Sequence, residues 1–570
     1  MLRPVRAGTL PRMGDVATRR SRRSRARASL TLACFVVAGC GSTSDDSGTV
    51  GAGPDAGADA ASEAASDAAA DTSADVTADG ATDPSDPSVV TFHARATRDG
   101  VYVQPTLTRA RAATLARDAT FDGTVSGKVR AQPLFVDAPG GHGRFLVVTD
   151  RDEVDALDET TGAVAWTRDL GPSAAHTGAG CGNVVPVGAT STPAIDLATR
   201  TAYVALARGT DATASSVIAT YEVHALSLDD GSERAGWPVD LGSLHHGAIG
   251  FDARYENQRG ALLLQGGTLY VPFGGHYGDC GPYHGYLVAL DVATATVVGA
   301  YATAAEGGGS WAVGGPAGDG ASVFVTTGNT KGAAAWGGGE AVLRFPSAAS
   351  LDGDPADLWV PTNWQQLDAA DVDIGGTGAL LLDVAGATPS ALVMAMGKDG
   401  ELYLLDRAHL GGLASAPLAH LHAGAAGTEF TNAPAAFTTS AGTFVAFRHH
   451  DGGSIAGCPN AVAGADLGVV RVTPTAPPTL ALVWCATSGG YGSPMVTMTD
   501  AAGADAMVWA EGAEGDERLR GWDGATGALV YAGGGAGDAL GHTQHFTTPI
   551  AVRGRVVVGS DGKLNVFSAP

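Results

Sequence analysis

The sequence predicts an all-β protein built as an eight-bladed β-propeller, with seven blades as the alternative. Three observations lead to this prediction. A hairpin pattern first met at residues 153–166 recurs along the chain, short apolar strands begin eight times at intervals of about 55 to 70 residues, and the last unit is one strand short. Hairpins that return at a fixed period are typical of a propeller.

The first hairpin is the segment EVDALDETTGAVAW at residues 153–166. Val154 and Ala156 alternate with polar residues, as do Val164 and Trp166, so all four are expected on one face of two paired strands. The intervening DETTG supplies a turn whose glycine can take a positive φ. Weaker versions of the pattern occur at residues 224–237, 287–298, 402–407 and 521–531.

Each blade is expected to begin with a short apolar strand, usually entered through a proline or glycine turn. A strongly β-forming run follows each of these strands and would supply the second strand of the blade. The eight predicted first strands are residues 132–136, 192–195, 260–264, 315–317, 378–382, 433–437, 493–496 and 548–552.

The ring is expected to close with strands from both ends of the chain. The last unit has no outer strand because the chain stops at Pro570, while residues 120–125 precede the first blade and are free to fill that place. Closure removes exposed sheet edges, which otherwise invite aggregation.

Aromatic residues fall on or near the outer strands of successive units. Packing between blades explains them better than contact with a ligand. They are Trp166, Trp237, Trp359, Trp484, Tyr301 and Tyr531.

Residues 1–39 read as a signal peptide. Nine arginines precede the apolar run LTLACFVV at residues 30–37, which is too short to span a bilayer but suits an export signal. The following VAGC resembles the bacterial lipobox, in which the cysteine, here Cys40, becomes the lipidated first residue. The sequence therefore predicts a membrane anchor at Cys40, with an ordinary cleavage site as the alternative.

Residues 40–88 are expected to be a disordered, acidic linker, and residues 89–570 the propeller. Between residues 41 and 88 there are eleven acids, no base and no aromatic residue, so no core can form there. The whole chain has a formal net charge of −24, which argues against nucleic acid as a partner.

Four cysteines remain once the signal peptide is removed and Cys40 is acylated. An even number outside the cytoplasm makes two disulfides plausible, with free buried thiols as the alternative. Cys458 with Cys485 would close one blade, whereas Cys181 with Cys280 would tie loops of different blades.

The ALDETTGAVAW pattern of residues 156–166 resembles the tryptophan-docking repeat of the pyrroloquinoline-quinone (PQQ) dehydrogenases, and the resemblance extends from about Val89 to the end of the chain. Non-enzymatic propellers, including outer-membrane assembly lipoproteins, share this repeat, so it specifies the fold rather than an activity. Other stretches resemble a branch of secreted bacterial quinoprotein-like propellers: residues 129–135, 190–196, 283–288 and 398–407.

The resemblance also implies a cofactor site. Trp311 would form the floor under the quinone, Asn329 in Thr-Gly-Asn would bind Ca²⁺, and Lys398 would approach the quinone oxygens. A carboxylate would remove the substrate's proton while the metal polarises the quinone. The acids in the region of the catalytic aspartate are Asp368, Asp371 and Asp373.

Departures from the family weaken that reading. The sequence has no adjacent cysteine pair to cover the quinone, no clear counterpart of the calcium glutamate, and no Cys-x-x-Cys-His for a covalent haem. Structural roles are the alternative, because a tryptophan can cap a channel and Asp-x-Asp segments stabilise loops.

The sequence therefore favours a lipid-anchored, extracytoplasmic bacterial protein of the periplasm or cell surface, acting as a binding or scaffold module. Its channel mouth would accept a small ligand or a protein partner. The alternative is a PQQ- and calcium-dependent dehydrogenase of alcohols or sugars, with Asp371 or Asp373 as the base.

Overall fold

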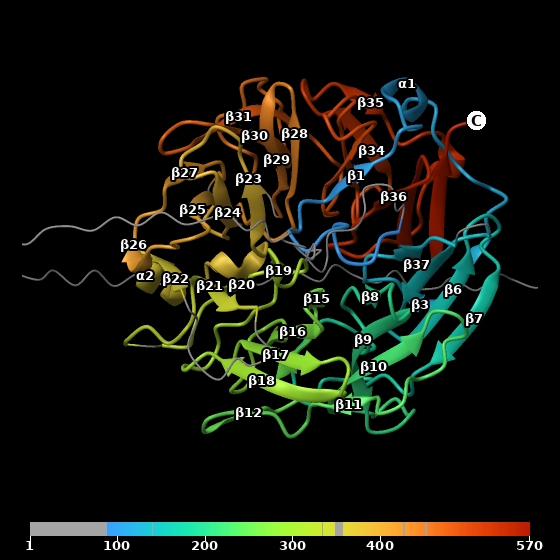
Figure 1. Ribbon diagram of the computed structural model, residues 1–570, viewed down its shortest axis with the longest axis vertical. Coiled ribbons are helices and arrows are strands. Elements are labelled where there is room, and N and C mark those ends of the chain that lie inside the picture. Colours follow the sequence, from blue (N-terminus) through green and yellow to red (C-terminus); the bar gives the residue numbers. More distant parts are fainter. Residues whose placement is uncertain (1–87, 139–140, 333, 348–356, 426–427, 451–452) are drawn as a thin grey trace, which may run out of the picture. The chain divides into compact units, whose positions relative to one another are not determined.

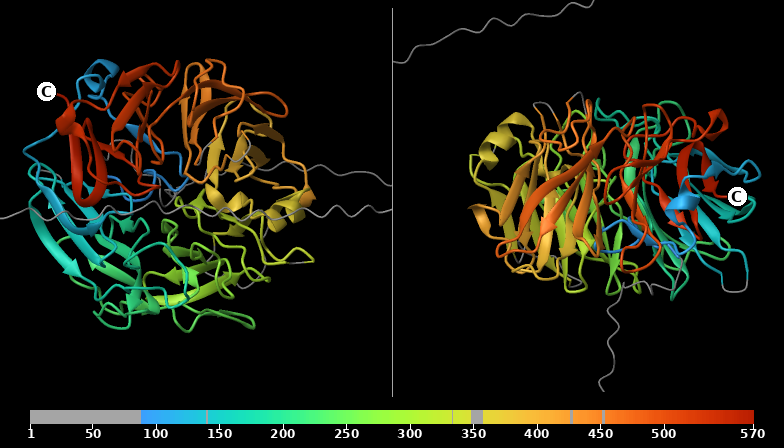
Figure 2. Two further views of the ribbon diagram at one scale, coloured as in Figure 1. Left: turned by 180° about the vertical axis from the view of Figure 1, so that it is seen from behind. Right: turned by 90° about the horizontal axis from the view of Figure 1, so that it is seen from above.

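The computed structural model describes residues 88–138, 141–332, 334–347, 357–425, 428–450 and 453–570, all within one compact unit, Asp75–Pro570. Cys40, the signal peptide and most of the linker lie outside the described residues. Eight sheets of four or five strands form a ring (Figures 1 and 2). The prediction of eight blades is thereby confirmed over seven. Within these residues, no helix has the length and apolar character needed to cross a membrane.

Blades 1 to 4 follow the chain from the inner to the outer strand. Blade 1 contains β4 (Leu134–Val136), β5 (Arg144–Val148), β6 (Glu153–Asp158) and β7 (Val164–Asp169). Blade 2 contains β8 (Ala194–Asp196), β9 (Thr201–Gly209), β10 (Ile218–Ser227) and β11 (Val239–Asp240). Blade 3 contains β15 (Leu263–Gln265), β16 (Thr268–Gly275), β17 (Tyr286–Asp291) and β18 (Thr296–Ala302), with β14 (Glu256–Asn257) beside β16. Blade 4 contains β19 (Ala317–Gly318), β20 (Ser322–Thr327), β21 (Ala341–Pro346), β22 (Asp357–Pro361) and β26 (Gly412–Ser415).

Blades 5 to 7 continue in the same order. Blade 5 contains β23 (Leu380–Asp383), β24 (Ala391–Met396), β25 (Glu401–Asp406) and β27 (Ala419–His422). Blade 6 contains β28 (Ala435–Thr439), β29 (Gly442–Arg448), β30 (Leu467–Thr473) and β31 (Thr479–Ala486). Blade 7 contains β32 (Met495–Met498), β33 (Met507–Glu511), β34 (Leu519–Asp523) and β35 (Leu529–Tyr531), with β1 (Val101–Val103) inside β32. Each of these inner strands overlaps a range predicted from the sequence.

Blade 8 joins the two ends of the described chain. Its strands are β36 (Ile550–Val552), β37 (Arg555–Ser568), which folds back on itself, β3 (Gly123–Lys128) and β2 (Ala116–Arg117). Gly123 pairs with Leu564, and Ala116 pairs with Ser568. The predicted closure by the segment before blade 1 is thus present, and β3 starts three residues later than expected.

Few elements lie outside the sheets of the blades. They are the hairpin β12 (His245–His246) with β13 (Ile249–Gly250), the helices α1 (Arg109–Ala112) and α2 (Trp364–Ala370), and the 3₁₀ turns η1 (Ile374–Gly376) and η2 (Ala536–Asp538).

The first hairpin departs from the predicted pattern at one residue. Ala156 pairs with Trp166 but Leu157 pairs with Val164, so Ala165 bulges out of the ladder. A bulge inserts one residue and reverses the faces beyond it. Val164 is therefore 52% exposed while Trp166 is 8% exposed, and the two side chains do not share a face as the alternation suggested.

The tryptophans of the repeat dock one blade against the next. Trp166 Nε1 donates to the carbonyl oxygen of Leu228 in blade 2 at 3.1 Å, and Trp484 Nε1 of blade 6 donates to Gly524 in blade 7 at 2.9 Å. Gly231 lies against the first ring, where an added Cβ would come within 2.6 Å of the indole. Trp166 and Trp484 therefore have the role between blades that the sequence predicts.

Two disulfides form with the pairing expected from the sequence. Cys458 and Cys485 join within blade 6, with Cα atoms 5.8 Å apart. Cys181, between blades 1 and 2, joins Cys280, between β16 and β17 of blade 3, with Cα atoms 6.2 Å apart.

Candidate functional site

The residues singled out in the sequence meet at one end of the central channel. Trp311 lies just before β19, Asp373 just before β23, Asn329 just after β20 and Lys398 between β24 and β25. Inner strands of a propeller run in the same direction along its axis, so their starts share one face, and an antiparallel second strand ends at that face too. We call this the channel mouth, formed by Arg259, Trp311, Asn329, Asp371, Asp373 and Lys398.

Lys398 pairs with two carboxylates of the mouth. Its Nζ lies 2.7 Å from Asp373 Oδ2 and 3.2 Å from Asp371 Oδ1, and 5.4 Å from the ring centre of Trp311. Burial opposes the charge of Lys398, but the carboxylates of Asp373 and then Asp371 outweigh it and raise the pKa of the ammonium group above its usual value. The mouth therefore carries a permanent cation beside an aromatic face.

Asp373 uses both of its oxygens within the protein. While Oδ2 faces Lys398, Oδ1 accepts the backbone N–H of Asn329 at 2.7 Å, and the residue is 3% exposed. Gly328 allows this approach, since an added Cβ would lie 2.7 Å from that same Oδ1. Asp368 acts similarly by accepting the Thr330 hydroxyl at 2.7 Å. These acids fix the loop after β20.

Asp371 differs from Asp373 because it faces solvent. It ends α2 in the left-handed conformation with φ of 57°, and its side chain is 59% exposed. Burial of the group, opposed by Lys398, raises its pKa above the ordinary value. Of the three acids named from the sequence, Asp371 is the exposed one that a molecule in the mouth can reach.

Arg259 packs against the tryptophan floor. Its Nε and Nη2 donate to the carbonyl oxygen of Trp311 at 3.1 and 2.9 Å, and its guanidinium carbon lies 5.0 Å from the ring centre of Trp311 and 4.7 Å from that of Phe546. Burial, and then the nearby Arg130, lowers the pKa of Arg259 to about 10, so it stays charged at neutral pH. No carboxylate of the described chain forms an ion pair with it.

A neutral acid lies beneath the loop that carries Asn329. Glu340 is fully buried, its Oε2 accepts the backbone N–H of Ile374 at 2.8 Å, and its Oε1 has no partner among the described residues. Burial, and then the charge of Asp373, raises the pKa of Glu340 to about 10. Its proton reduces the negative charge beside Asp373.

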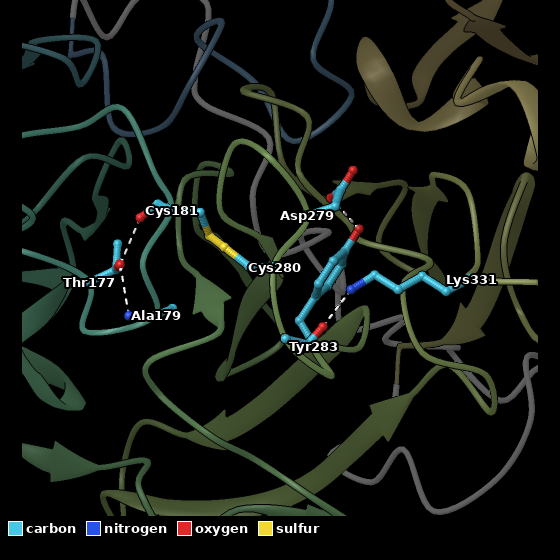
Figure 3. The surroundings of a disulfide bond; sticks show 8 residues. Thr177, Ala179, Cys181, Asp279, Cys280, Tyr283 and Lys331 are labelled. Atoms are coloured by element: carbon cyan, nitrogen blue, oxygen red, sulfur yellow. Dashed lines mark hydrogen bonds between the residues drawn. A yellow bond between two sulfur atoms is a disulfide. The ribbon is translucent and has the colours of Figure 1, made fainter.

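One wall of the mouth is tied by the disulfide between Cys181 and Cys280 (Figure 3). The hydroxyl of Tyr283 donates to Asp279 Oδ1 at 2.7 Å, and Lys331 Nζ lies 4.5 Å from the ring centre of Tyr283. Lys331 also donates to the carbonyl oxygen of Gly281. The loop between β16 and β17 is therefore held both by a covalent bond and by a cation from blade 4.

Two cations and an aromatic side chain meet at the mouth. Trp311 offers an aromatic face, and Arg259 and Lys398 supply positive charge close to it. In the part of the chain that the structure describes, no group of three or more His, Cys, Asp or Glu side chains is placed to hold a metal ion. Asn329 donates its backbone N–H to Asp373 Oδ1, and Asp373 Oδ2 faces Lys398.

Sequence reasoning missed Arg259, Glu340 and Tyr283. A signal for Arg259 was available, because it directly precedes the predicted inner strand 260–264, the position from which side chains reach the mouth. Glu340 gave no comparable signal, since its burial follows from the packing of η1 against β20 and β21.

Comparison with known proteins supports the fold. No protein-family model matches the chain, and no curated protein matches it. Among solved structures, a quinohemoprotein alcohol dehydrogenase from Pseudomonas putida HK5 superposes with a TM-score of 0.60 and 14% identity, over 85% of this chain and 81% of that one. A europium-containing methanol dehydrogenase gives 0.57 and 14%, over 85% and 99%. Quinohemoprotein alcohol dehydrogenase from Comamonas testosteroni gives 0.56 and 15%, over 84% and 80%.

Proposed function

We infer that the protein is a binding module that takes a flat, anionic small molecule at the channel mouth. Arg259 is the observation that carries this proposal. It is a cation held against the rings of Trp311 and Phe546 without a carboxylate partner in the described chain, so a ligand carboxylate could approach it without displacing an existing ion pair. Lys398 supplies a second cation beside the same indole.

The test is a titration of the purified protein with PQQ, used as a flat tricarboxylate probe, and with a panel of smaller aromatic carboxylates, followed by tryptophan fluorescence. Saturable quenching is expected. Arg259→Gln should weaken binding about tenfold or more, because a hydrogen bond to a charged group contributes about 1.5 to 3 kcal/mol. Trp311→Phe should remove most of the quenching.

Arg200→Gln is the matched control. Arg200 lies away from the mouth, and its Nη2 is 2.6 Å from Asp229 Oδ1. It should bind the probe as the unaltered protein does. Absence of saturable quenching with every probe would refute the proposal, and so would equal dissociation constants for the Arg259 and Arg200 variants.

A PQQ-dependent dehydrogenase is the second candidate. The meeting of Trp311, Lys398 and the two acids at the mouth favours it. Bound PQQ would supply the electron-accepting quinone. The chain's own part would be proton removal from the substrate by Asp371, whose carboxylate is exposed.

Dye reduction with alcohols and sugars decides between the candidates. An enzyme should lose nearly all of its activity in a folded Asp371→Asn variant. The matched Asp383→Asn variant changes another exposed acid, on β23, and should keep its activity. Saturable probe binding without any dye reduction leaves the binding module and removes the dehydrogenase.

A further inference from the structure

The first described residues of the chain run inside the ring of blades. Residues 88–104, which we call the hub strap, cross the centre of the propeller before β1 joins blade 7 (Figure 1). Val89 and Phe135 of β4 exchange backbone hydrogen bonds of 2.8 and 3.0 Å. Five further inner strands donate a backbone N–H to a strap carbonyl at 2.7 to 3.0 Å, through Ile195, Gly318, Leu381, Ala436 and Val496.

Successive residues of the strap contact the blades in the order of their numbering. The strap's acceptors are the carbonyl oxygens of Val90, Ala96, Thr97, Asp99 and Gly100, which meet blades 2, 4, 5, 6 and 7 respectively. An inner strand pairs outward with its neighbour and leaves its other edge facing the channel, where unpaired backbone groups would be costly. The strap satisfies that edge around most of the ring.

Side chains of the strap reach the two blades that its backbone does not. Arg98 is 3% exposed, and its Nη2 and Nε donate to Leu262 of blade 3 at 3.0 Å and to Pro316 of blade 4 at 2.8 Å. Gln104 donates to Ala551 of blade 8 at 3.1 Å. All eight blades are therefore bonded to one segment of 17 residues.

The strap forms a U with both ends on the face opposite the mouth. Val89 lies antiparallel to Phe135, whereas β1 lies parallel to β32. Because inner strands run from the mouth to the opposite face, the strap must rise along blade 1 and descend along blade 7. The turn lies beneath the mouth, where Phe92 is buried in one cluster with Ala261, Val313 and Ala433.

We propose that the hub strap is both a clasp and a plug: it holds the eight inner strands together, and it closes the channel below Trp311. The mouth is then a blind cup that exchanges its ligand through one entrance. The clasp and plug do not depend on what the mouth binds.

Hydrogen exchange on the full chain tests the clasp. In the unaltered protein the five donor amides should exchange as slowly as amides of the second strands, which pair on both sides. Exchange of these five within seconds would overturn the proposal, because an edge facing an open channel has no such protection.

Arg98→Ala removes the side chain that joins blades 3 and 4, and Arg98→Lys keeps the charge but lacks the fork that reaches both carbonyls. Both should lower Tm and speed exchange at Gly318 and Leu381 at least tenfold. Arg95→Ala is the matched control, because Arg95 belongs to the same strap, its side chain is 38% exposed, and it forms an ion pair with Asp99. Equal exchange in the Arg98 and Arg95 variants would overturn the clasp.

Phe92→Ala tests the plug. It should leave a void under the floor and speed exchange at least tenfold at the amides of Ala261 and Gly315, which donate to the carbonyl oxygens of Val313 and Ala312 at 3.0 Å, with little effect on blade 6 amides remote from the floor. If exchange at the floor is unchanged, the strap does not support it and the channel is not plugged there.

Discussion

Glu340 makes the stability of the protein depend on pH. Its carboxyl is fully buried beside Asp373, and its pKa is raised from 4.5 to about 10. Between these two values the folded protein keeps a proton that the unfolded chain releases. Stability must therefore fall as pH rises through this window, by at most about 1.4 kcal/mol per pH unit.

Glu340→Gln should remove that slope while keeping the acceptor for the N–H of Ile374. Near pH 5 the free energy of unfolding of the variant should be equal to or lower than that of the unaltered protein. At pH 8 it should be higher by about 2 to 4 kcal/mol, as measured by denaturant unfolding. Glu306→Gln, at an exposed glutamate, serves as the control. A Glu340→Gln effect that is the same at both pH values would contradict the assignment of a neutral acid.

The candidate site shows how far residue-level prediction reached. Trp311, Asn329, Asp373 and Lys398 were named from the sequence, and the fold does bring them together. Their contacts could not be read from spacing, because they depend on loops from different blades. Thus the backbone N–H of Asn329 bonds to Asp373, and both Asp371 and Asp373 pair with Lys398.

The two disulfides close loops of very different length. Cys181 and Cys280 are 99 residues apart, whereas Cys458 and Cys485 are 27 apart. A cross-link stabilises the folded state by restricting the unfolded chain, by about 4.7 and about 3.5 kcal/mol for loops of these lengths.

Cys181→Ser with Cys280→Ser should therefore lower the free energy of unfolding by about 1 kcal/mol more than Cys458→Ser with Cys485→Ser. Hydrogen exchange in the loop between β16 and β17 should also rise in the first variant alone, because that loop loses a covalent tie. A larger loss in the second variant would contradict this account.

The positions of individual strands were easier to predict than which of their side chains share a face. Proline and glycine turns before apolar runs located every inner strand, because such turns are short-range signals. The bulge at Ala165 was missed, since it inserts a residue without any change in composition. Similar register shifts occur in the outer hairpins of blades 3, 6 and 7, so the deviation belongs to the repeat.

For the whole molecule, blade number followed from the period of the repeat and from the strand missing at the end. The hub strap could not be predicted in this way, because residues 88–104 contain no periodic pattern. Their conformation is set by hydrogen bonds to the inner edges of the blades. A segment whose conformation is set entirely by distant residues is poorly predicted from local sequence.

At the scale of the whole chain, we propose that lipidation at Cys40 attaches the protein to a membrane. Two disulfides in the structure fit an oxidising compartment, as does an export signal. Cys40→Ala should move the protein from the membrane fraction to the soluble fraction of cells. Undiminished membrane association of that variant would contradict lipidation at Cys40.

The closure of blade 8 has a consequence for biosynthesis. A chain that passes through a secretion channel from its N-terminus delivers β2 and β3 early and β37, their only partner strand in the described structure, last. No ring can close until translocation ends, so every partly translocated chain carries open sheet edges. An exported chain in this state would need a chaperone on the far side of the membrane to prevent aggregation. The amount of chaperone required should increase with the rate of export.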